Sequence, residues 1–360
     1  MKSAFPLARV DVFRRELQFK SPARTSRDTL LSKPSWFLCV ETSDGRTAWG
    51  ECSLILGLSP DKASDVEAFF DALKASKLLS LESVPSHLPA VRMAVEMVIR
   101  ALQTENPVGY FPGAFTRGER ALEMNGLIWM DEPDGMMVQA KKLLDQGFNT
   151  LKMKVGSRPF ELEIGWLREL REEAGNSVTL RCDANGAFSR AEPRWTPMRK
   201  LEALAALAFH SIEQPLQPED TSALGQLCLD SPLPIALDES LIGVHGSLQP
   251  TLLERIRPQF LVLKPSLIGG FEQAQHWVSH AEAMGMGWWV TSALESNLGL
   301  YAIAQWVSDG VETSQPLLPQ GLGTGGLFTN NVAGSMEVQR GHLVNRLEEN
   351  WSSLARFFAS

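Results

Sequence analysis

The chain has 360 residues, of which 44% are hydrophobic and 21% are charged, with 28 glycines and 21 prolines. These values are ordinary for a globular protein and exclude a disordered chain, a collagen-like chain and a small disulfide-stapled fold. Lys and Arg total 34 against 42 Asp and Glu, so the net charge is −8 at pH 7. Because that charge repels polyphosphate, we expect no nucleic-acid partner.

The cysteines and the N-terminal stretch indicate a reducing, aqueous compartment. The four cysteines are widely spaced and form no CxxC pair, which is typical of free thiols: Cys39, Cys52, Cys182 and Cys228. The opening MKSAFPLARVDVFRRELQFK carries Arg and Asp where a signal peptide needs an apolar run. No window reaches about 18 consecutive apolar residues. We therefore expect a cytoplasmic protein with no membrane partner.

The first 118 residues predict an α+β domain, because strand-like segments precede helix-like ones. Apolar and β-branched residues predict three strands and then two helices, at 8–19, 35–41, 46–52, 60–73 and 88–102. The stretch PVGYFPGAFTRG at 107–118 breaks both periodicities with Pro and Gly, and we interpret it as a linker.

From 119 to 325 the sequence predicts a βα repeat. Short β-rich segments ending in a polar residue alternate with helix-like segments, such as 136–146 and 161–173, which stop at Gly147 and Gly175. Six strands are expected at 149–154, 178–183, 209–213, 234–238, 259–264 and 287–292. An opening strand near 125–130 and a last one near 317–325 would complete a closed parallel barrel of the TIM type.

The ends of these strands carry the residues that can do chemistry. In a βα barrel the carboxyl ends of the strands meet at one mouth, where catalytic residues gather. Read in order, the ends are Lys154, Asp183, Glu213, Asp238, Lys264 and Ser292. Taken alone, an acid or a lysine at a strand end is more often a solvated loop residue. Three consecutive strand ends with acids, flanked by two with lysines, are not expected of unrelated solvated loops. Three clustered carboxylates need a cation, and oxygen ligands suit Mg²⁺.

The lysines indicate proton transfer next to a substrate carboxylate. Lys152 and Lys154 lie on one face of their strand by two-residue alternation. A neighbouring positive charge favours the neutral amine, which makes Lys154 our candidate base. A carboxylate held by Mg²⁺ stabilises the charge that develops when its α-proton is removed.

The motifs around these residues resemble the enolase superfamily, in particular its muconate lactonizing subgroup. They are LKMKVG, RCDANGAF, SIEQPL, ALDES and LVLKPSLIGG. The resemblance implies a modified (β/α)7β barrel whose mouth is capped by the N-terminal α+β domain, with the tail at 326–360 returning to that cap. It also implies that Asp183, Glu213 and Asp238 hold Mg²⁺, with Mn²⁺ as a possible substitute, supported by Asn185 and Glu239. Lys154 and Lys264 would then face each other across the substrate.

Three further stretches resemble the o-succinylbenzoate synthase family within that subgroup. They are PARTSRDTLLSKPSWFL, TSALESNLGL and QGLGTGGLFTNN. This resemblance implies syn dehydration of a small-molecule cyclohexadiene carboxylate through an enediolate, with Lys154 as base and then acid, and Lys264 staying protonated. Lys152, Arg27, Ser292 and Gly323 are the candidate substrate contacts, Arg27 because a guanidinium can clamp a second carboxylate.

Other functions were compared at the same positions. A mandelate-racemase-like enzyme needs a histidine base, and a dipeptide epimerase usually carries Asp-x-Asp where residues 318–325 read LPQGLGTG. N-acylamino acid racemization uses the same two lysines and metal site, so it stays open as the alternative. A non-catalytic metal-binding relative would not need both lysines. The GLGTGG run follows the repeat rather than a first strand, so we interpret it as a tight turn, not a dinucleotide site.

Overall fold

The chain was analysed as a computed structural model that describes residues 4–24, 29–104, 106–346, 351, 354 and 358. Within these residues, a seven-stranded parallel sheet runs in the order β13-β12-β11-β10-β9-β8-β7. Its strands are β7 (Gly126–Ile128), β8 (Thr150–Lys154), β9 (Thr179–Asp183), β10 (Ser211–Glu213), β11 (Ile235–Leu237), β12 (Phe260–Leu263) and β13 (Gly287–Val290). Consecutive strands are neighbours throughout, as a βα repeat requires.

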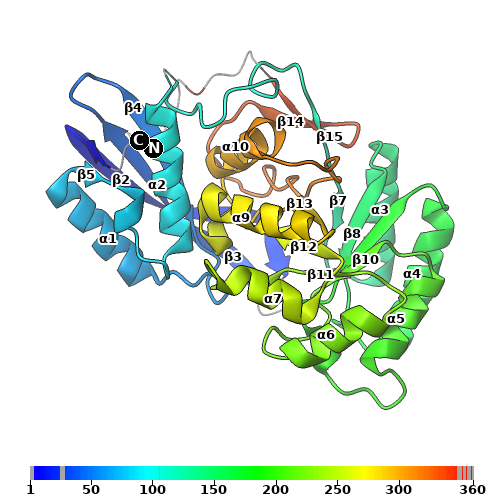
Figure 1. The fold of residues 1–360 in the computed structure, drawn as a ribbon. Helices are drawn as coiled ribbons and strands as arrows, with labels where there is room; N and C mark the ends of the chain where they lie inside the picture. Colours follow the sequence, from blue (N-terminus) through cyan, green and yellow to red (C-terminus); the bar gives the residue numbers. More distant parts are fainter. Residues whose placement is uncertain are drawn as a thin grey trace.

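An eighth segment closes this sheet into a barrel. Gln320 bridges Met124 and Gly321 bridges Thr291, both in parallel, so this segment lies between the first and the last strand. The segment lies within the predicted closing stretch at 317–325. The fold is therefore the (β/α)7β barrel of the TIM type that the sequence predicted, with helices packed around its outer face (Figure 1).

The two helices predicted in the barrel are present, with α3 beginning at Pro133 rather than at residue 136 and α4 spanning Phe160–Ala174. The predicted helices at 136–146 and 161–173 are α3 and α4, and left-handed Gly147 and Gly175, with φ of 81° and 68°, follow their ends. Their bounds and those of the later helices are α3 (Pro133–Asp145), α4 (Phe160–Ala174), α5 (Pro197–Ala206), α6 (Thr221–Asp230), α7 (Leu248–Ile256), α8 (Pro265–Ile268), α9 (Gly270–Ala283) and α10 (Asn297–Gln305).

A second, antiparallel sheet lies before the barrel in the chain, in the order β2-β3-β4. Together with two helices it forms the α+β unit that we call the cap, drawn in blue and cyan in Figure 1. Its main elements are β2 (Arg9–Arg24), β3 (Thr29–Glu41), β4 (Thr47–Ser53), α1 (Ala63–Ser76) and α2 (Pro89–Leu102). Short strands β1 (Phe5–Pro6) and β5 (Leu78–Leu79) pair beside it.

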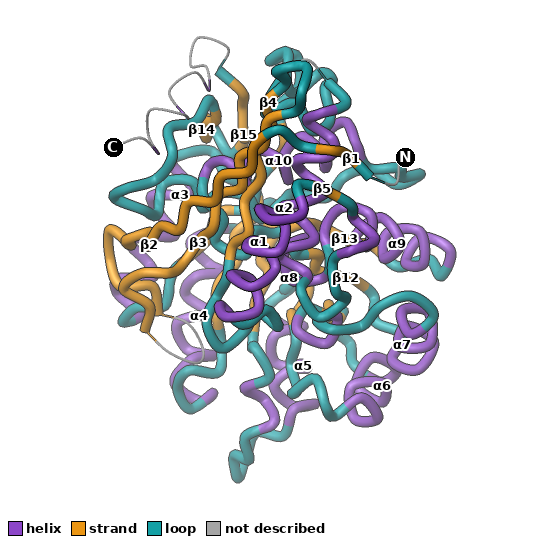
Figure 2. The backbone as a smooth tube through the Cα atoms, turned by 90° about the vertical axis from the view of Figure 1, so that its left-hand side faces the viewer, coloured by secondary structure: helices purple, strands orange, loops and turns teal. Residues whose placement is uncertain are grey.

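The cap differs from the prediction in the length of its hairpin. β2 and β3 pair far beyond the predicted strand ends, with a register irregularity between Gln18 and Ala23 (Figure 2). The stretches 20–24 (KSPAR) and 29–34 (TLLSKP) lack a regular apolar alternation, so the sequence pattern does not mark this extension. Helix α1 begins at Ala63 rather than at the predicted residue 60.

The last described residues add a hairpin and a ring contact. Strand β14 (Met336–Gln339) pairs with β15 (His342–Asn345), and β15 pairs on its other side with β6 (Leu122–Glu123), which precedes the first barrel strand. Phe358 lies among the cap rings of Phe13, Phe37 and Trp49, with centroids 4.7 to 5.1 Å away. The C-terminal segment thus contacts both the barrel and the cap. No helix among the described residues is long and apolar enough to cross a membrane.

Candidate active site

The predicted strand-end residues meet at one mouth of the barrel, beside a cavity of about 590 Å³. Register explains this, because Lys154 pairs with Asp183 and Asp183 with Glu213 across neighbouring strands. The cavity is lined by the three lysines, by one of the three strand-end acids and by residues of the following turns: Lys152, Lys154, Lys264, Asp183, Asn185, Glu239, Ser292, Gly323 and Thr324. Of the predicted site residues, Arg27 alone lies outside the described residues.

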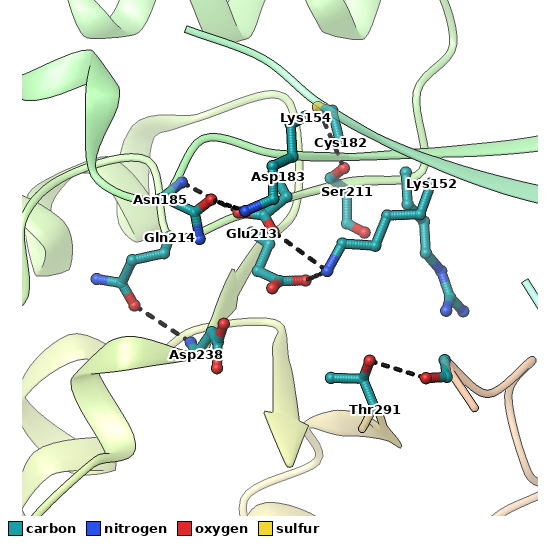
Figure 3. A network of polar contacts seen from close by, with 12 residues as sticks. Lys152, Lys154, Cys182, Asp183, Asn185, Ser211, Glu213, Gln214, Asp238 and Thr291 are labelled. Carbon is teal, nitrogen blue, oxygen red and sulfur yellow. Dashed lines mark hydrogen bonds and ion pairs between the residues drawn. The ribbon is translucent and has the colours of Figure 1, made fainter. Parts of the chain in front are cut away.

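Lys152 holds two of the three strand-end acids. Its ammonium donates to Glu213 Oε2 at 2.5 Å and lies 3.3 Å from Asp183 Oδ2 (Figure 3). Desolvation lowers the pKa of Lys152, but Glu213 and Asp183 outweigh it and leave the pKa raised. The two carboxylates thus favour the charged form of Lys152.

The acids differ strongly in charge state because they share one small, buried space. Desolvation raises the pKa of Asp183, yet Lys152, Lys154 and Lys264 outweigh it and lower that pKa to about 2. Desolvation and the Asp183 charge raise the pKa of Glu213 to about 8. Crowded carboxylates of this kind favour any additional cation that can reach them.

Asp238 and Lys264 form the second ion pair of the mouth. Asp238 follows β11, and Lys264 follows β12 and donates to Asp238 Oδ2. Desolvation lowers the pKa of Lys264, but the opposing effect of Asp238, Glu213 and Glu239 is larger, so its pKa is raised on balance and the charged form is favoured. Desolvation raises the pKa of Asp238. In sheet order β8 and β12 are separated by three strands, so Lys154 and Lys264 lie on different sides of the mouth.

Lys154 has a different environment from the other two lysines. Its Nζ donates to Asn185 Oδ1 at 2.5 Å, and among the described residues it forms no ion pair within 4.0 Å. Asn185 in turn donates from Nδ2 to Glu239 Oε1 at 2.7 Å, which fixes its amide orientation. Of the three lysines, Lys154 is thus the one whose amine is held by a neutral side chain.

The fit of a divalent metal ion depends on how the three acids are arranged. Among the residues that the structure describes, no three Asp, Glu, His or Cys side chains surround a common metal position. The ammonium groups of Lys152 and Lys264 instead hold the carboxylates in separate pairs. Glu213 Oε1 nevertheless is buried without a hydrogen-bond partner, and so is Glu239 Oε2. Unpartnered carboxylate oxygens in an all-oxygen set fit a hard divalent cation.

Gln214 supports the site, and the sequence prediction missed it. This fully buried residue has φ of 40° and accepts the backbone N–H groups of Asp238 and Ser240 at 3.2 Å. Its amide nitrogen donates to Ser240 Oγ at 2.8 Å. Gln214 thereby joins the turn after β10 to the turn that carries Asp238. Its position directly after Glu213 in SIEQPL was the available signal.

Apolar residues from the cap form the other wall of the cavity. Leu30, Ile55, Leu56 and Leu58 line it opposite the barrel residues Trp129 and Met130. Leu56 is 62% exposed, so much of its apolar side chain is open to solvent at the edge of this cavity. On the barrel side, Ser292 Oγ lies 2.6 Å from Thr324 Oγ1, which joins the last strand end to the GLGTGG turn.

Comparison with known proteins agrees with this geometry. The family model described as "Enolase C-terminal domain-like" matches residues 135–342. The chain therefore belongs to the enolase superfamily. It is 40% identical to the o-succinylbenzoate synthase of Desulfotalea psychrophila over 365 residues, covering 92% of this chain and 97% of that protein.

Solved structures give the same result at the level of the fold. The crystal structure of MenC from Desulfotalea psychrophila superposes with a TM-score of 0.79 and 35% identity, covering 93% of this chain and 99% of that one. A dipeptide epimerase from Enterococcus faecalis, complexed with Mg and L-Leu-L-Tyr, has a TM-score of 0.80 at 20% identity, covering 95% and 97%. The L-Ala-D/L-Glu epimerase of Bacillus subtilis is 26% identical over 84% of this chain and 85% of its own.

Proposed function

We propose that this chain catalyses the o-succinylbenzoate synthase reaction of menaquinone biosynthesis. In this reaction 2-succinyl-6-hydroxy-2,4-cyclohexadiene-1-carboxylate loses water and becomes 2-succinylbenzoate. The observation that carries the proposal is the 40% identity to such a synthase across 92% of the chain. It is supported by Lys154 and Lys264, which line one cavity from separate strand ends, and by the buried acids Asp183, Glu213 and Asp238 at the same barrel mouth.

The three acids are the residues that would hold Mg²⁺, or Mn²⁺, which takes the same oxygen donors. When bound, the metal ion supplies a Lewis acid for the substrate carboxylate. Asp183 and Glu213 would exchange their contact with Lys152 for the ion, and Asp238 its contact with Lys264. The unpartnered Glu213 Oε1 supports this assignment.

Lys154 is the proposed base and acid. Its amine takes the proton from the carbon that bears the carboxylate, which breaks that C–H bond. The C–O bond on the adjacent carbon then breaks, and Lys154 returns the proton to the departing hydroxyl, giving water and an aromatic ring. A single residue can serve both steps only if both groups leave from one face, as in a syn elimination.

Lys264 is the proposed cation that stabilises the negative charge as it develops. In this proposal Lys264 enters the reaction as an ammonium, whose positive charge stabilises the developing anion. Lys152, Ser292 and Gly323 remain the proposed substrate contacts, and Arg27 remains the candidate for the succinyl carboxylate. Asn185 supports Lys154 by the 2.5 Å hydrogen bond, and Glu239 supports Asn185.

A racemase or epimerase activity is the second candidate. The dipeptide epimerase relative of Bacillus subtilis matches 84% of this chain, and proton removal by one of two lysines is the first step of both reactions. The apolar cap residues Ile55 and Leu56 would accept the side chain of an N-acylamino acid as readily as a ring.

One assay separates the two functions. Purified protein with Mg²⁺ and the cyclohexadiene substrate is followed by ultraviolet absorbance of the aromatic product, with EDTA as control. Rapid EDTA-sensitive product formation is the expected result. Absence of product, together with α-proton exchange of N-acylamino acids in D₂O, would assign the site to racemization instead.

The expected compartment agrees with the cysteines. All four carry free thiols, and three of them are buried. Burial raises the pKa of Cys182 well above its ordinary value, so this thiol is a packing residue rather than a nucleophile. We propose that the protein works in the reducing cytosol.

A further inference from the structure

A buried carboxylate of the cap binds the N-terminus of a barrel helix. Glu51 lies on β4 and is 1% exposed. Its Oε1 accepts the backbone N–H of Ser296 at 2.9 Å, and its Oε2 accepts the Ser296 hydroxyl at 2.5 Å and the N–H of Gly299 at 2.9 Å. These are the first donors of α10, so Glu51 supplies from the cap the acceptor that a helix N-terminus requires.

The local sequence of α10 is built around this contact. Ser296 is the N-cap, and its Oγ also accepts the N–H of Leu298 at 3.1 Å. A Cβ at Gly299 would lie 2.8 Å from Glu51 Oε2. A glycine at this position therefore lets the carboxylate approach the helix directly.

The loop between this contact and the mouth is held by a second buried acid. Glu295 is fully buried, and its Oε1 accepts the Ser266 hydroxyl at 2.5 Å while its Oε2 accepts the N–H of Ala293 at 2.8 Å. Ser266 lies two residues after Lys264, and Ala293 directly follows Ser292. A continuous set of contacts thus joins the α10 N-terminus to the turns that carry Lys264 and Ser292.

A buried lysine extends this set of contacts. Lys33 is 1% exposed, and its Nζ donates to Ser35 Oγ at 3.0 Å and to Ser53 Oγ at 2.6 Å. Ser35 links Lys33 to Glu51, because its own hydroxyl donates to Glu51 Oε1 at 3.0 Å. Disrupting a buried network of this kind is costly, because each polar group in it would lose its partner.

We propose that Glu51 is a positioning residue for the reaction, which seats the 292–296 loop and, through Glu295, the turn after Lys264. This inference rests on the proposed function, since it assigns Lys264 a place in the chemistry. Its physical basis is that a misplacement of about 1 Å at a reacting group can reduce the rate on the order of 100-fold. Glu51 itself is not among the residues that line the cavity.

The test compares Glu51→Gln with wild type and with Glu67→Gln, an exposed acid of the same unit that pairs with Arg14. Glutamine keeps the size of Glu51 but places an amide N–H₂ against donors. We expect kcat to fall about 10- to 100-fold while KM changes less than about threefold. Glu51→Asp, which keeps the charge, should recover part of the loss. Ser35→Ala, a milder change, provides the same comparison if Glu51→Gln does not fold.

A double-mutant cycle with Ser296→Ala tests whether Glu51 affects kcat through its contact with Ser296. If Glu51 acts through Ser296, the double variant is no slower than the slower single variant, whereas independent effects multiply. An unchanged kcat in folded Glu51→Gln, or a change in KM alone, overturns the proposal.

Hydrogen exchange separates this inference from the proposed function. The backbone N–H groups of Ser296 and Gly299 should exchange at least about tenfold faster in Glu51→Gln than in wild type, and not in Glu67→Gln. If the wild type does not dehydrate the substrate, the proposed function is wrong. The exchange rates would still show whether Glu51 holds the N-terminus of α10. Unchanged exchange at both positions overturns the positioning role whatever the activity.

Discussion

The Lys152 ammonium donates to Glu213 Oε2 at 2.5 Å, reaching from β8 to β10 across the strand between them. This contact places a cation where a divalent ion would meet the same acid. In the proposed metal site, Mg²⁺ would therefore compete with this ion pair for the Glu213 carboxylate. Substitutions of the acids and of the lysines should therefore change different quantities, namely the affinity for Mg²⁺ and the turnover rate.

Loss of Asp183 should weaken metal binding. We expect Asp183→Ala to lower the affinity for Mg²⁺ by at least about 100-fold, since removing even a supporting residue of a metal site costs roughly 10- to 100-fold. Isothermal titration with Mg²⁺ measures this. Asp230→Ala, which changes an exposed acid of α6, is the matched control and should bind as wild type does. Equal affinity in the two variants would remove Asp183 from the ligand set.

Loss of Lys154 should abolish turnover and spare the metal site. Lys154→Ala is expected to reduce kcat by at least about 10³-fold, because general acid–base catalysis contributes roughly 10²–10⁴-fold and one amine serves both steps. Mg²⁺ affinity should stay within about threefold of wild type, since Lys154 contacts Asn185 and not the acids at ion-pair distance. The control is Lys141→Ala on exposed α3. Near-normal turnover of Lys154→Ala contradicts its role as base.

Stability should depend on pH through Asp61. This side chain accepts the N–H groups of Ala90 and Val91 at the start of α2, but desolvation dominates and raises its pKa to about 6. Between about pH 4 and pH 6 the folded state keeps a proton that the unfolded state has lost, so stability falls as pH rises through this window. The shift of roughly two pKa units corresponds to about 3 kcal/mol.

The variant Asp61→Asn isolates this effect. Asparagine keeps an acceptor for α2 and does not titrate, so the free energy of unfolding should fall less between pH 4.5 and 7 than in wild type, by about 2 kcal/mol. Urea denaturation at the two pH values measures the difference. Asp71→Asn on exposed α1 should follow the wild-type curve. Parallel curves for wild type and Asp61→Asn would contradict the raised pKa.

Gln305 should fix the linker between the cap and the barrel. It is fully buried at the end of α10, where its Oε1 accepts the N–H groups of Tyr110 and Phe111 at 2.9 Å and its Nε2 donates to Val108 O at 2.9 Å. Gln305→Ala leaves three buried groups unpaired and should lower the free energy of unfolding by about 2–4 kcal/mol. Chemical denaturation tests this, with exposed Gln226→Ala as the control. A loss below about 0.5 kcal/mol would mean that water replaces the amide.

The sequence by itself determined the residues at the barrel mouth and their order. Parallel strands bring their carboxyl ends together, so the local period of each βα unit was sufficient to place Lys154, Asp183 and Glu213 side by side. The sequence also indicated the helix ends at Gly147 and Gly175, because glycine readily adopts the positive φ that is common just after a helix. These features depend on neighbours close in the chain, and a single sequence records them.

Only the tertiary structure decided which partner each of these side chains takes. That Lys152 reaches Glu213, that Gln214 joins two turns, and that Glu51 binds the start of α10 some 245 residues away are contacts between distant segments. No local pattern encodes them, because a buried hydrogen bond constrains the distance between two groups and not their separation in sequence. The same reason hid the apolar wall that the cap contributes to the cavity.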